Sequence, residues 1–157
     1  RVVSIAVVPE RFHSRLNAKR KIYRYRIWNT AVPTVFERRY VYVLPEPLHI
    51  TAMQQAASFL IGRHDFKSFT SSKKGKKSTV RTIECITIER LGNEVVLTYQ
   101  GDGFLYHMVR IVTGTLVEVG LGMRSADSVA ALLENGKREH AGVLLPAKGL
   151  CLMEVQY

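Results

Sequence analysis

The sequence has few of the residues from which most metal and cofactor sites are built. It contains two cysteines, Cys85 and Cys151, in separate apolar runs, and its five histidines are scattered without ligand-like pairs. We therefore expect two free, buried thiols in a reducing compartment and no disulfide framework. A phosphate-cradling glycine loop and a Ser/His/Asp or Cys/His catalytic pattern are also absent. The residues therefore show no metal-ligand cluster and no recognisable catalytic triad or nucleotide-binding loop.

Long hydrophobic segments are absent as well. The apolar run at residues 2–8 is too short for a membrane span or for a signal peptide with its cleavage site. We therefore expect a cytoplasmic protein without a membrane partner, and we interpret the run as a buried strand that Pro9 ends. Because the sequence begins with Arg1 rather than Met and enters this strand directly, it is expected to be a piece of a longer protein.

Acidic residues are scarce, and aspartate is especially so. Against 23 Lys and Arg there are 13 Asp and Glu, which gives a formal net charge of +10, and only three aspartates occur. The basic residues concentrate at 1–40 and 63–81, and the lysine-rich segment at 71–78 is expected to be a mobile loop. Such clusters favour a polyanionic partner, with nucleic acid the leading candidate. A basic surface that only meets solvent is the alternative.

The hydrophobic periodicity predicts a single α+β domain over residues 1–157. We expect a mostly antiparallel mixed sheet with helices packed on one face and the other face free for a ligand. The expected caps are Thr51 and Gly62 for the first helix, Asp102 for the second and Gly136 after the third. Beyond residues 2–8, strands are expected at 22–28, 39–43, 82–90, 95–100 and 150–157, and helices at 51–61, 104–119 and 125–135.

The most informative residue is Arg110, which is the only basic residue of the apolar segment 101–120 apart from His107. A guanidinium cannot lose its charge through a pKa shift, so a buried arginine needs an anionic partner or a ligand. No acid occurs three or four residues away to pair with it on a helix. We interpret Arg110 as an active-site cation that pairs with a catalytic carboxylate or a substrate phosphate. A structural ion pair with Glu118 or Asp102 is the alternative.

A second pattern is the alternation of aromatic and basic residues in Tyr23-Arg24-Tyr25-Arg26. Aromatic rings stack on bases and arginines contact phosphates in the recognition of single-stranded RNA. The same alternation also fits an ordinary strand with tyrosines in the core and arginines outside, and the pattern does not separate the two. The basic connection at residues 12–21 likewise has two interpretations: it could contact an RNA backbone, or it could be a solvated loop.

These segments resemble, in order and spacing, the carboxy-terminal part of the TruA-type tRNA pseudouridine synthases. The matching pieces cover nearly the whole chain, and the Phe-x-x-x-Met-Val-Arg segment and the Tyr-Arg-Tyr strand are the specific ones. The pieces are Phe12-His13-Ser14-Arg15 with Ala18, Tyr23-Arg24-Tyr25, residues 62–69, Arg81-Thr82, residues 104–114 and Ala147-Lys148-Gly149-Leu150.

The resemblance implies an enzyme that isomerises uridine to pseudouridine in the anticodon stem-loop of tRNA, as a homodimer and without a cofactor or an obligatory metal. It assigns Tyr23 to stacking on the target base and accepting a proton, and Arg110 to pairing with the catalytic aspartate. Leu150, most simply a core residue at the start of a strand, would pack beside the target base. The residues expected to lie along the tRNA backbone are Arg15, Lys19, Arg20, Lys21 and Arg24.

The nucleophilic aspartate of that family stands in an Arg-Thr-Asp-Ala-Gly motif, which this sequence lacks. The similar run Arg81-Thr82-Ile83-Glu84 lies at a different place in the family's order, so Glu84 is not expected to replace the aspartate. The resemblance therefore predicts the carboxy-terminal half of a synthase, built from two similar α/β halves, that is inactive alone. Two alternatives stay open: an RNA-binding module without chemistry, and a scaffold that pairs with a separate chain carrying the aspartate.

Overall fold

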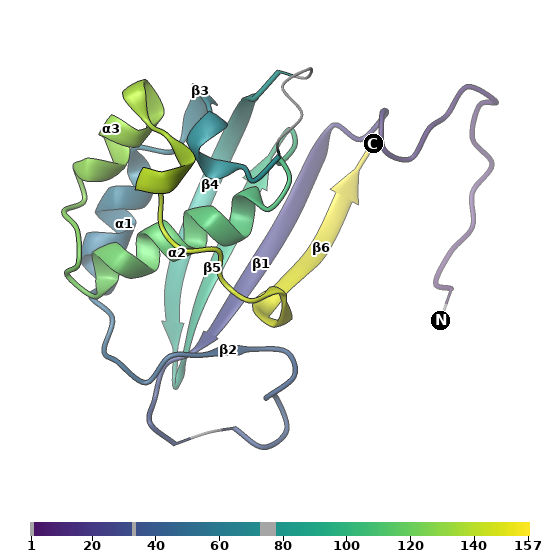
Figure 1. Ribbon diagram of the computed structural model, residues 1–157. Helices are drawn as coiled ribbons and strands as arrows, with labels where there is room; N and C mark the ends of the chain where they lie inside the picture. The colour runs from purple at the N-terminus through teal and green to yellow at the C-terminus, as the bar shows by residue number, and fades with distance from the viewer. Residues whose placement is uncertain (1, 33, 73–77) are drawn as a thin grey trace.

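The centre of the protein is a six-stranded sheet (Figure 1). The computed structural model describes residues 2–32, 34–72 and 78–157, so the run 73–77 of the expected mobile loop lies outside the described residues. The strand order is β2-β1-β5-β4-β3, with β6 pairing β1 on the edge that β2 also occupies. All pairs are antiparallel except β1 with β2. The strands are β1 (Arg20–Trp28), β2 (Tyr42–Val43), β3 (Gly62–Asp65), β4 (Val80–Leu91), β5 (Glu94–Gly101) and β6 (Leu150–Gln156).

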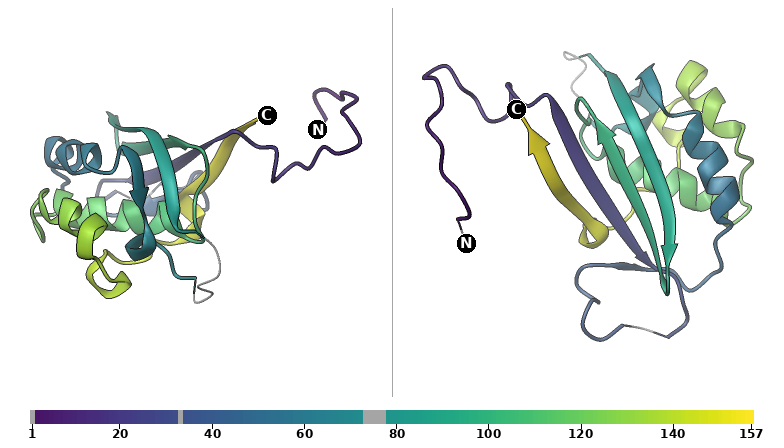
Figure 2. Two further views of the ribbon diagram at one scale, coloured as in Figure 1. Left: turned by 90° about the horizontal axis from the view of Figure 1, so that it is seen from above. Right: turned by 180° about the vertical axis from the view of Figure 1, so that it is seen from behind.

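Three helices pack on one face of the sheet, and the view from behind shows the other face uncovered (Figure 2). They are α1 (Ile50–Ser58), α2 (Met108–Gly120) and α3 (Ser128–Asn135). This arrangement confirms the predicted α+β class, a mostly antiparallel mixed sheet with helices on one face. Among the described residues, no helix combines the length and hydrophobicity needed to cross a bilayer. The core joins both layers through fully buried side chains, among them Tyr25, Ile83, Leu97, Tyr99, Met53, Ile111 and Leu116.

The alternating patterns predict strands β1, β4, β5 and β6, but not β3, which forms where a helix cap was expected. The predicted strands at 82–90 and 95–100 form a hairpin, β4 and β5, that turns at Gly92 and Asn93, and β6 occupies the predicted last strand. In β1, Tyr25 and Ile27 are fully buried on the helix-covered side, while Arg24 is exposed. The predicted strand at 39–43 is shorter than expected, because only Tyr42 and Val43 pair with β1.

The predicted helix caps are wrong apart from Gly136, which follows α3 directly. His49, not Thr51, precedes α1, and Gly62 adopts a φ of +111° at the start of β3 instead of ending the helix. Asp102 does not cap α2, because its carboxylate accepts a hydrogen bond from the Thr82 N–H at 3.0 Å. A turn at residues 104–107 separates the two, so α2 begins at Met108.

The prediction of a buried strand at residues 2–8 is wrong for this chain. The segment is irregular and extends away from the sheet (Figure 1). Its apolar side chains are open to solvent, with Val3 92% and Ile5 90% exposed. A strand forms only where another strand supplies hydrogen bonds, and no strand among the described residues pairs with this segment.

Both cysteines are free, as expected, but they are exposed and not buried. Cys151 lies opposite the exposed Arg24 in the β1–β6 pair, so it faces the open side of the sheet. Cys85 follows a shift in register between Ile83 and Cys85. Ile83 is buried on the helix side, and the extra residue turns Cys85 outward. Simple alternation from Ile83 could not reveal this bulge.

Candidate active site

Helix α2 is buried on almost all sides, which explains why both of its faces are apolar. The sheet lies on one side, where the Tyr99 hydroxyl contacts the Thr113 hydroxyl at 2.8 Å. On the other side passes the segment of residues 141–149, which we call the strap and which leads into β6 (Figure 1). A side chain at Gly114 would overlap the Val143 carbonyl oxygen of the strap. Gly114 therefore lets the backbone of the strap pass close to α2.

Arg110 holds the far end of the strap. Its Nε donates a hydrogen bond to the Leu145 carbonyl oxygen at 2.6 Å, and the side chain is part-buried. Within the described part of the chain, no carboxylate lies within 4.0 Å of the guanidinium. Asp102 binds the Thr82 N–H, and Glu118 pairs with Arg124. The alternative of a structural ion pair with either acid is therefore wrong, and a carbonyl compensates only part of the charge of a guanidinium.

Tyr25 holds the next carbonyl of the strap from the sheet side. Its hydroxyl donates a hydrogen bond to the Pro146 oxygen at 2.6 Å. Burial raises the pKa of Tyr25, although the positive charge of Arg110 opposes that shift. The phenol therefore stays protonated and remains a donor. The pattern at 22–28 left open whether Tyr25 is buried or free to stack on a base, and it did not predict this contact, since carbonyl groups leave no mark in a sequence.

Tyr23 and Leu150 lie next to these contacts, on the same side of the sheet as Tyr25. Leu150 is directly opposite Tyr25 in the β1–β6 pair, and Tyr23 is opposite Leu152. The ring of Tyr23 packs edge-on against Phe104, with 5.3 Å between centroids. Tyr23 and Leu150 are both partly exposed, so a planar ligand could reach them. Tyr23 and Leu150 thus face the helix layer and not the open face of the sheet, which the sequence analysis expected to be free for a ligand.

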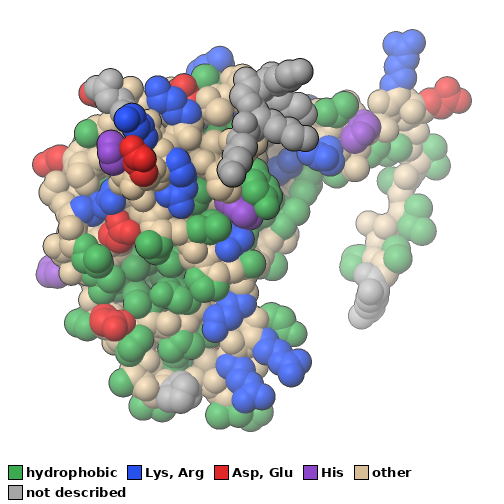
Figure 3. Space-filling view, viewed as in Figure 1, with side chains coloured by type: hydrophobic (Ala, Val, Ile, Leu, Met, Phe, Trp, Pro, Cys, Tyr) green, Lys and Arg blue, Asp and Glu red, His purple; other side chains and the backbone are tan. Residues whose placement is uncertain are grey.

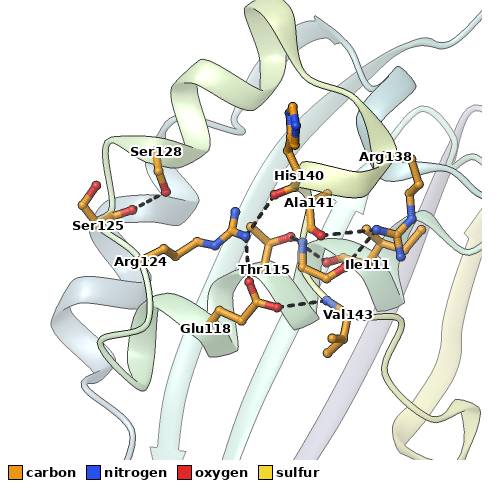
Figure 4. Close-up of polar contacts among 11 residues, drawn as sticks. Ile111, Thr115, Glu118, Arg124, Ser125, Ser128, Arg138, His140, Ala141 and Val143 are labelled. Carbon is orange, nitrogen blue, oxygen red and sulfur yellow. Dashed lines mark hydrogen bonds and ion pairs between the residues drawn. The ribbon is translucent and has the colours of Figure 1, made fainter.

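The near end of the strap is fixed by a polar network that the sequence did not reveal (Figure 4). The Glu118 carboxylate accepts a hydrogen bond from the Val143 N–H at 3.1 Å and pairs with Arg124 at 2.8 Å. Arg124 also donates to the His140 carbonyl oxygen at 3.0 Å, and the Thr115 hydroxyl accepts from the Gly142 N–H at 2.9 Å. Side chains of α2 thus hold the strap from residue 142 to residue 145.

The basic residues expected along RNA are not gathered at this site. Arg24 is exposed on the open face of the sheet, and Arg15 is exposed in the segment that precedes β1. Lys21 is two residues before Tyr23 in β1, so alternation puts it on the Tyr23 side. Glu84 is exposed and pairs with Arg20 at 2.6 Å, away from Arg110. Figure 3 shows basic side chains at both the upper and the lower end of the helix-covered face.

A separate cavity of about 590 Å³ lies at the other end of α2. Its lining includes His49, Gly120, Arg124 and Asp127, and none of the candidate residues Tyr23, Arg110 or Leu150 belongs to it. Across the described ranges, no three His, Cys, Asp or Glu side chains are grouped so that they could hold a metal ion. The arrangement at Arg110 instead offers a fixed cation beside aromatic and aliphatic side chains, which suits an anionic, planar ligand.

Residues 56–157 match the sequence model of the tRNA pseudouridine synthases. The chain belongs to this family. The match includes Arg110 and Leu150, whereas Tyr23 lies before it.

Individual relatives extend the similarity over almost the whole chain. The chain is 48% identical over 149 residues to tRNA pseudouridine synthase A of Halalkalibacterium halodurans, which covers 95% of this chain and 57% of that protein. It is 48% identical over 148 residues to tRNA pseudouridine synthase A 1 of Clostridium tetani, with 94% and 60% covered. It is 46% identical over 154 residues to tRNA pseudouridine synthase A of Brevibacillus brevis, an alignment that covers 98% of this chain and 63% of that protein. The chain thus spans about three fifths of the length of these relatives.

Proposed function

We propose that this chain is the carboxy-terminal half of an enzyme that isomerises uridine to pseudouridine in the anticodon stem-loop of tRNA. The relatives, all tRNA pseudouridine synthases by name, support the activity. The observation that carries the proposal is the state of Arg110. Its guanidinium is fixed beside the Tyr25–Leu150 pair by one backbone carbonyl and lacks a carboxylate among the described residues.

The chemistry of the reaction explains why such a cation needs an acid. In the isomerisation the bond from C1′ of the ribose to N1 of uracil breaks, the base turns, and a bond from C1′ to C5 forms. A proton leaves C5 and N1 gains one, so no oxidant, reductant or cofactor is consumed. A carboxylate at the sugar or the base is required as nucleophile or as a stabilising charge. We propose that an aspartate outside this chain fills this role and pairs with Arg110.

Two other residues complete the proposed pocket. The target uridine must leave its stack before the glycosidic bond becomes accessible, which requires an aromatic platform and a cavity for the base. Tyr23 is proposed to stack on the base and to accept the C5 proton, because its ring is partly exposed on the Arg110 side of the sheet. Leu150 is proposed to pack against the other part of the base. We assign Arg15, Lys21 and Arg24 to the RNA backbone.

Exposed apolar surface supports the assignment of the chain as one half of a larger unit. Strand β6 is an edge strand over most of its length, and its Leu152 and Met153 are each 46% exposed. Residues 2–8 are apolar and exposed too. Unpaired edges and apolar segments are normally covered in a folded protein. We propose that the other half of the synthase covers them, and that the whole enzyme is a cytoplasmic homodimer that needs no metal.

Release of tritium from tRNA labelled at C5 of uridine tests the proposed activity on the longer protein. We expect release from whole tRNA and from an isolated anticodon stem-loop, and none from a tRNA whose anticodon-arm uridines are replaced by cytidine. Release that is unaffected by this replacement would contradict the anticodon stem-loop as substrate.

An RNA-binding module without chemistry is the second candidate, because the basic surface and the aromatic strand serve it equally well. The gene upstream of Arg1 separates the two candidates. An Arg-Thr-Asp-Ala-Gly motif in the same reading frame supports the enzyme, whereas a start codon at or near Arg1 supports the binding module.

A further inference from the structure

The turn that precedes α2 contains the one strained side-chain-bearing residue of the described ranges. His107 has a φ of 64°, and every other described residue with a positive φ is a glycine. A residue with a Cβ avoids this left-handed region unless its surroundings hold it there, and such residues concentrate at functional sites. His107 is the N-cap of α2 and stands three residues before Arg110. A residue held in a strained conformation, His107, therefore lies next to the proposed site, and the family assignment gives it no role.

Contacts from the segment before the lysine run fix this turn. The Ser71 hydroxyl and Nδ1 of His107 are 2.7 Å apart, and the Thr70 hydroxyl donates to the Tyr106 carbonyl oxygen at 3.0 Å. The turn also closes on itself, because the Met108 N–H donates to the Leu105 oxygen at 3.0 Å. These three hydrogen bonds are made by backbone groups of the turn or by the imidazole ring of His107. The Tyr106 hydroxyl takes part in none of the three.

The effect of the strained turn is to present an aromatic ring to solvent. Tyr106 and His107 are stacked, with 3.7 Å between ring centroids and 26° between planes. Tyr106 is nevertheless 63% exposed, so the imidazole supports one side of its ring and most of its surface stays open. Burial first and the charge of Arg110 second lower the pKa of His107. The imidazole is therefore neutral near pH 7 and acts as a flat support.

The position of this ring points to the kind of ligand. Phe104, two residues earlier, packs on Tyr23, and Arg110 follows His107 by three residues. An open aromatic face beside a cation is the combination that binds unpaired bases in single-stranded RNA, because the ring stacks on the base and the cation attracts the phosphates.

We propose that Tyr106, supported by His107, is a stacking platform for an unpaired RNA base adjacent to the target uridine. This inference rests on the proposed function and deepens it: Tyr23 receives the target base, and Tyr106 receives a neighbour that is unstacked when the target leaves the loop. The platform accepts any base, since every base has a face that can stack.

The test uses the longer protein and an anticodon stem-loop transcript with 2-aminopurine next to the target uridine. Binding is measured by fluorescence anisotropy of an end label, and stacking by quenching of the 2-aminopurine. For Tyr106→Ala we expect about tenfold weaker binding and loss of the quenching, because a base–aromatic stack contributes about that factor or more. Tyr106→Phe keeps the ring and is expected to match the unmodified protein in both measurements.

Tyr40→Ala is the matched control. Tyr40 is 64% exposed and lies between β1 and β2, at the opposite end of the sheet from the start of α2 (Figure 1). We expect it to leave the quenching unchanged. Circular dichroism of each variant checks the fold.

The outcomes separate this inference from the proposed function. If the unmodified protein binds and isomerises the stem-loop while Tyr106→Ala quenches and binds equally well, the platform is refuted and the proposed function stands. If Tyr106→Phe loses as much binding and quenching as Tyr106→Ala, the hydroxyl and not the ring makes the contact, and stacking is refuted. If the unmodified protein does not bind the stem-loop at all, both proposals are overturned.

Discussion

Three arginines donate to carbonyl oxygens in the strap or next to it, and among the described residues only Arg124 also has a carboxylate partner. Arg124 pairs with Glu118 at 2.8 Å and donates to the His140 oxygen, so its charge is compensated within the fold. Arg110 donates to the Leu145 oxygen, a task that a neutral donor could perform. Arg138 donates to two carbonyl oxygens of the strap, those of Ala141 and Gly142, whereas Arg110 donates to one. The fold therefore accounts for arginine at residues 124 and 138 more fully than at residue 110. The difference separates a cation used for structure from a cation held in place for a partner.

The largest expected effect is that of Arg110→Ala on turnover. In the longer protein we expect kcat to fall by about 10³-fold or more, because a charge fixed at the reacting centre is lost. Binding of tRNA is expected to stay within about threefold, since counterion release depends on many other basic residues. Single-turnover kinetics and a filter-binding titration measure the two quantities. Loss of binding equal to the loss of rate would instead make Arg110 a phosphate contact.

Gly114→Ala is expected to have the largest effect on stability. Its new Cβ would overlap the Val143 oxygen, which is backbone and cannot move aside without shifting the strap. We expect the free energy of unfolding to fall by about 3 kcal/mol, as overpacking typically costs. Urea denaturation measures it. Gly103→Ala is the control, because its Cβ would meet only the Arg81 side chain at 3.7 Å, and an equal loss there would refute this role of the strap.

Glu118→Ala tests the comparison at Arg124, the arginine that has a carboxylate partner. It removes the acceptor of the Val143 N–H and leaves Arg124 without its carboxylate, so we expect a loss of about 2 kcal/mol in stability. The double variant Glu118→Ala with Arg124→Ala is expected to lose less than the sum of the two single losses. A fully additive result in denaturation experiments would show that the ion pair contributes nothing to holding the strap.

The smallest expected effect is a pH dependence at His107. Its pKa is lowered in the folded chain, so the unfolded state binds the proton more tightly and stability falls as the pH drops through the ordinary value of about 6.5. His107→Gln is expected to reduce this slope between pH 7 and pH 5, and His140→Gln, an exposed histidine, is the control.

The same histidine also reports on Arg110. Burial and, second, the charge of Arg110 lower the pKa of His107, and a carboxylate beside Arg110 in the longer protein would oppose the second cause. A proton NMR titration of the ring is therefore expected to give a higher pKa in the longer protein than in this chain. Equal values would argue against a new acid at Arg110.

Much of the fold follows from the sequence, and the reasons for the exceptions are physical. The alternation of Tyr23, Tyr25 and Ile27 predicted a strand with these side chains on one face, because side chains in a strand point to alternate faces, but it did not predict that this face is the buried one. The bulge that exposes Cys85 left no signal, since one extra residue reverses the alternation. Residues 2–8 have the composition of a strand, but composition does not supply the partner that a strand needs.

The candidate site was predicted in part. Arg110 stood out because a lone guanidinium in an apolar segment has to be explained, and the structure removes both local acids from consideration. Whether Tyr23 and Leu150 act as proposed is still a prediction. The carbonyls of Leu145 and Pro146, the Glu118–Arg124 pair and the strained turn at His107 could not be predicted. They depend on how distant segments meet in three dimensions, and backbone groups and torsion angles are not written in residue types.

The most direct test of the central claim compares this chain alone with the longer protein on the same tRNA. The claim is that Arg110 is half of a catalytic pair whose acid lies outside this chain. Tritium release from C5-labelled uridine, measured at equal protein concentrations, is expected to be at background for the chain and clearly above it for the longer protein. Turnover by the chain alone would contradict the account, because Arg110 would then act without the carboxylate that it is proposed to need.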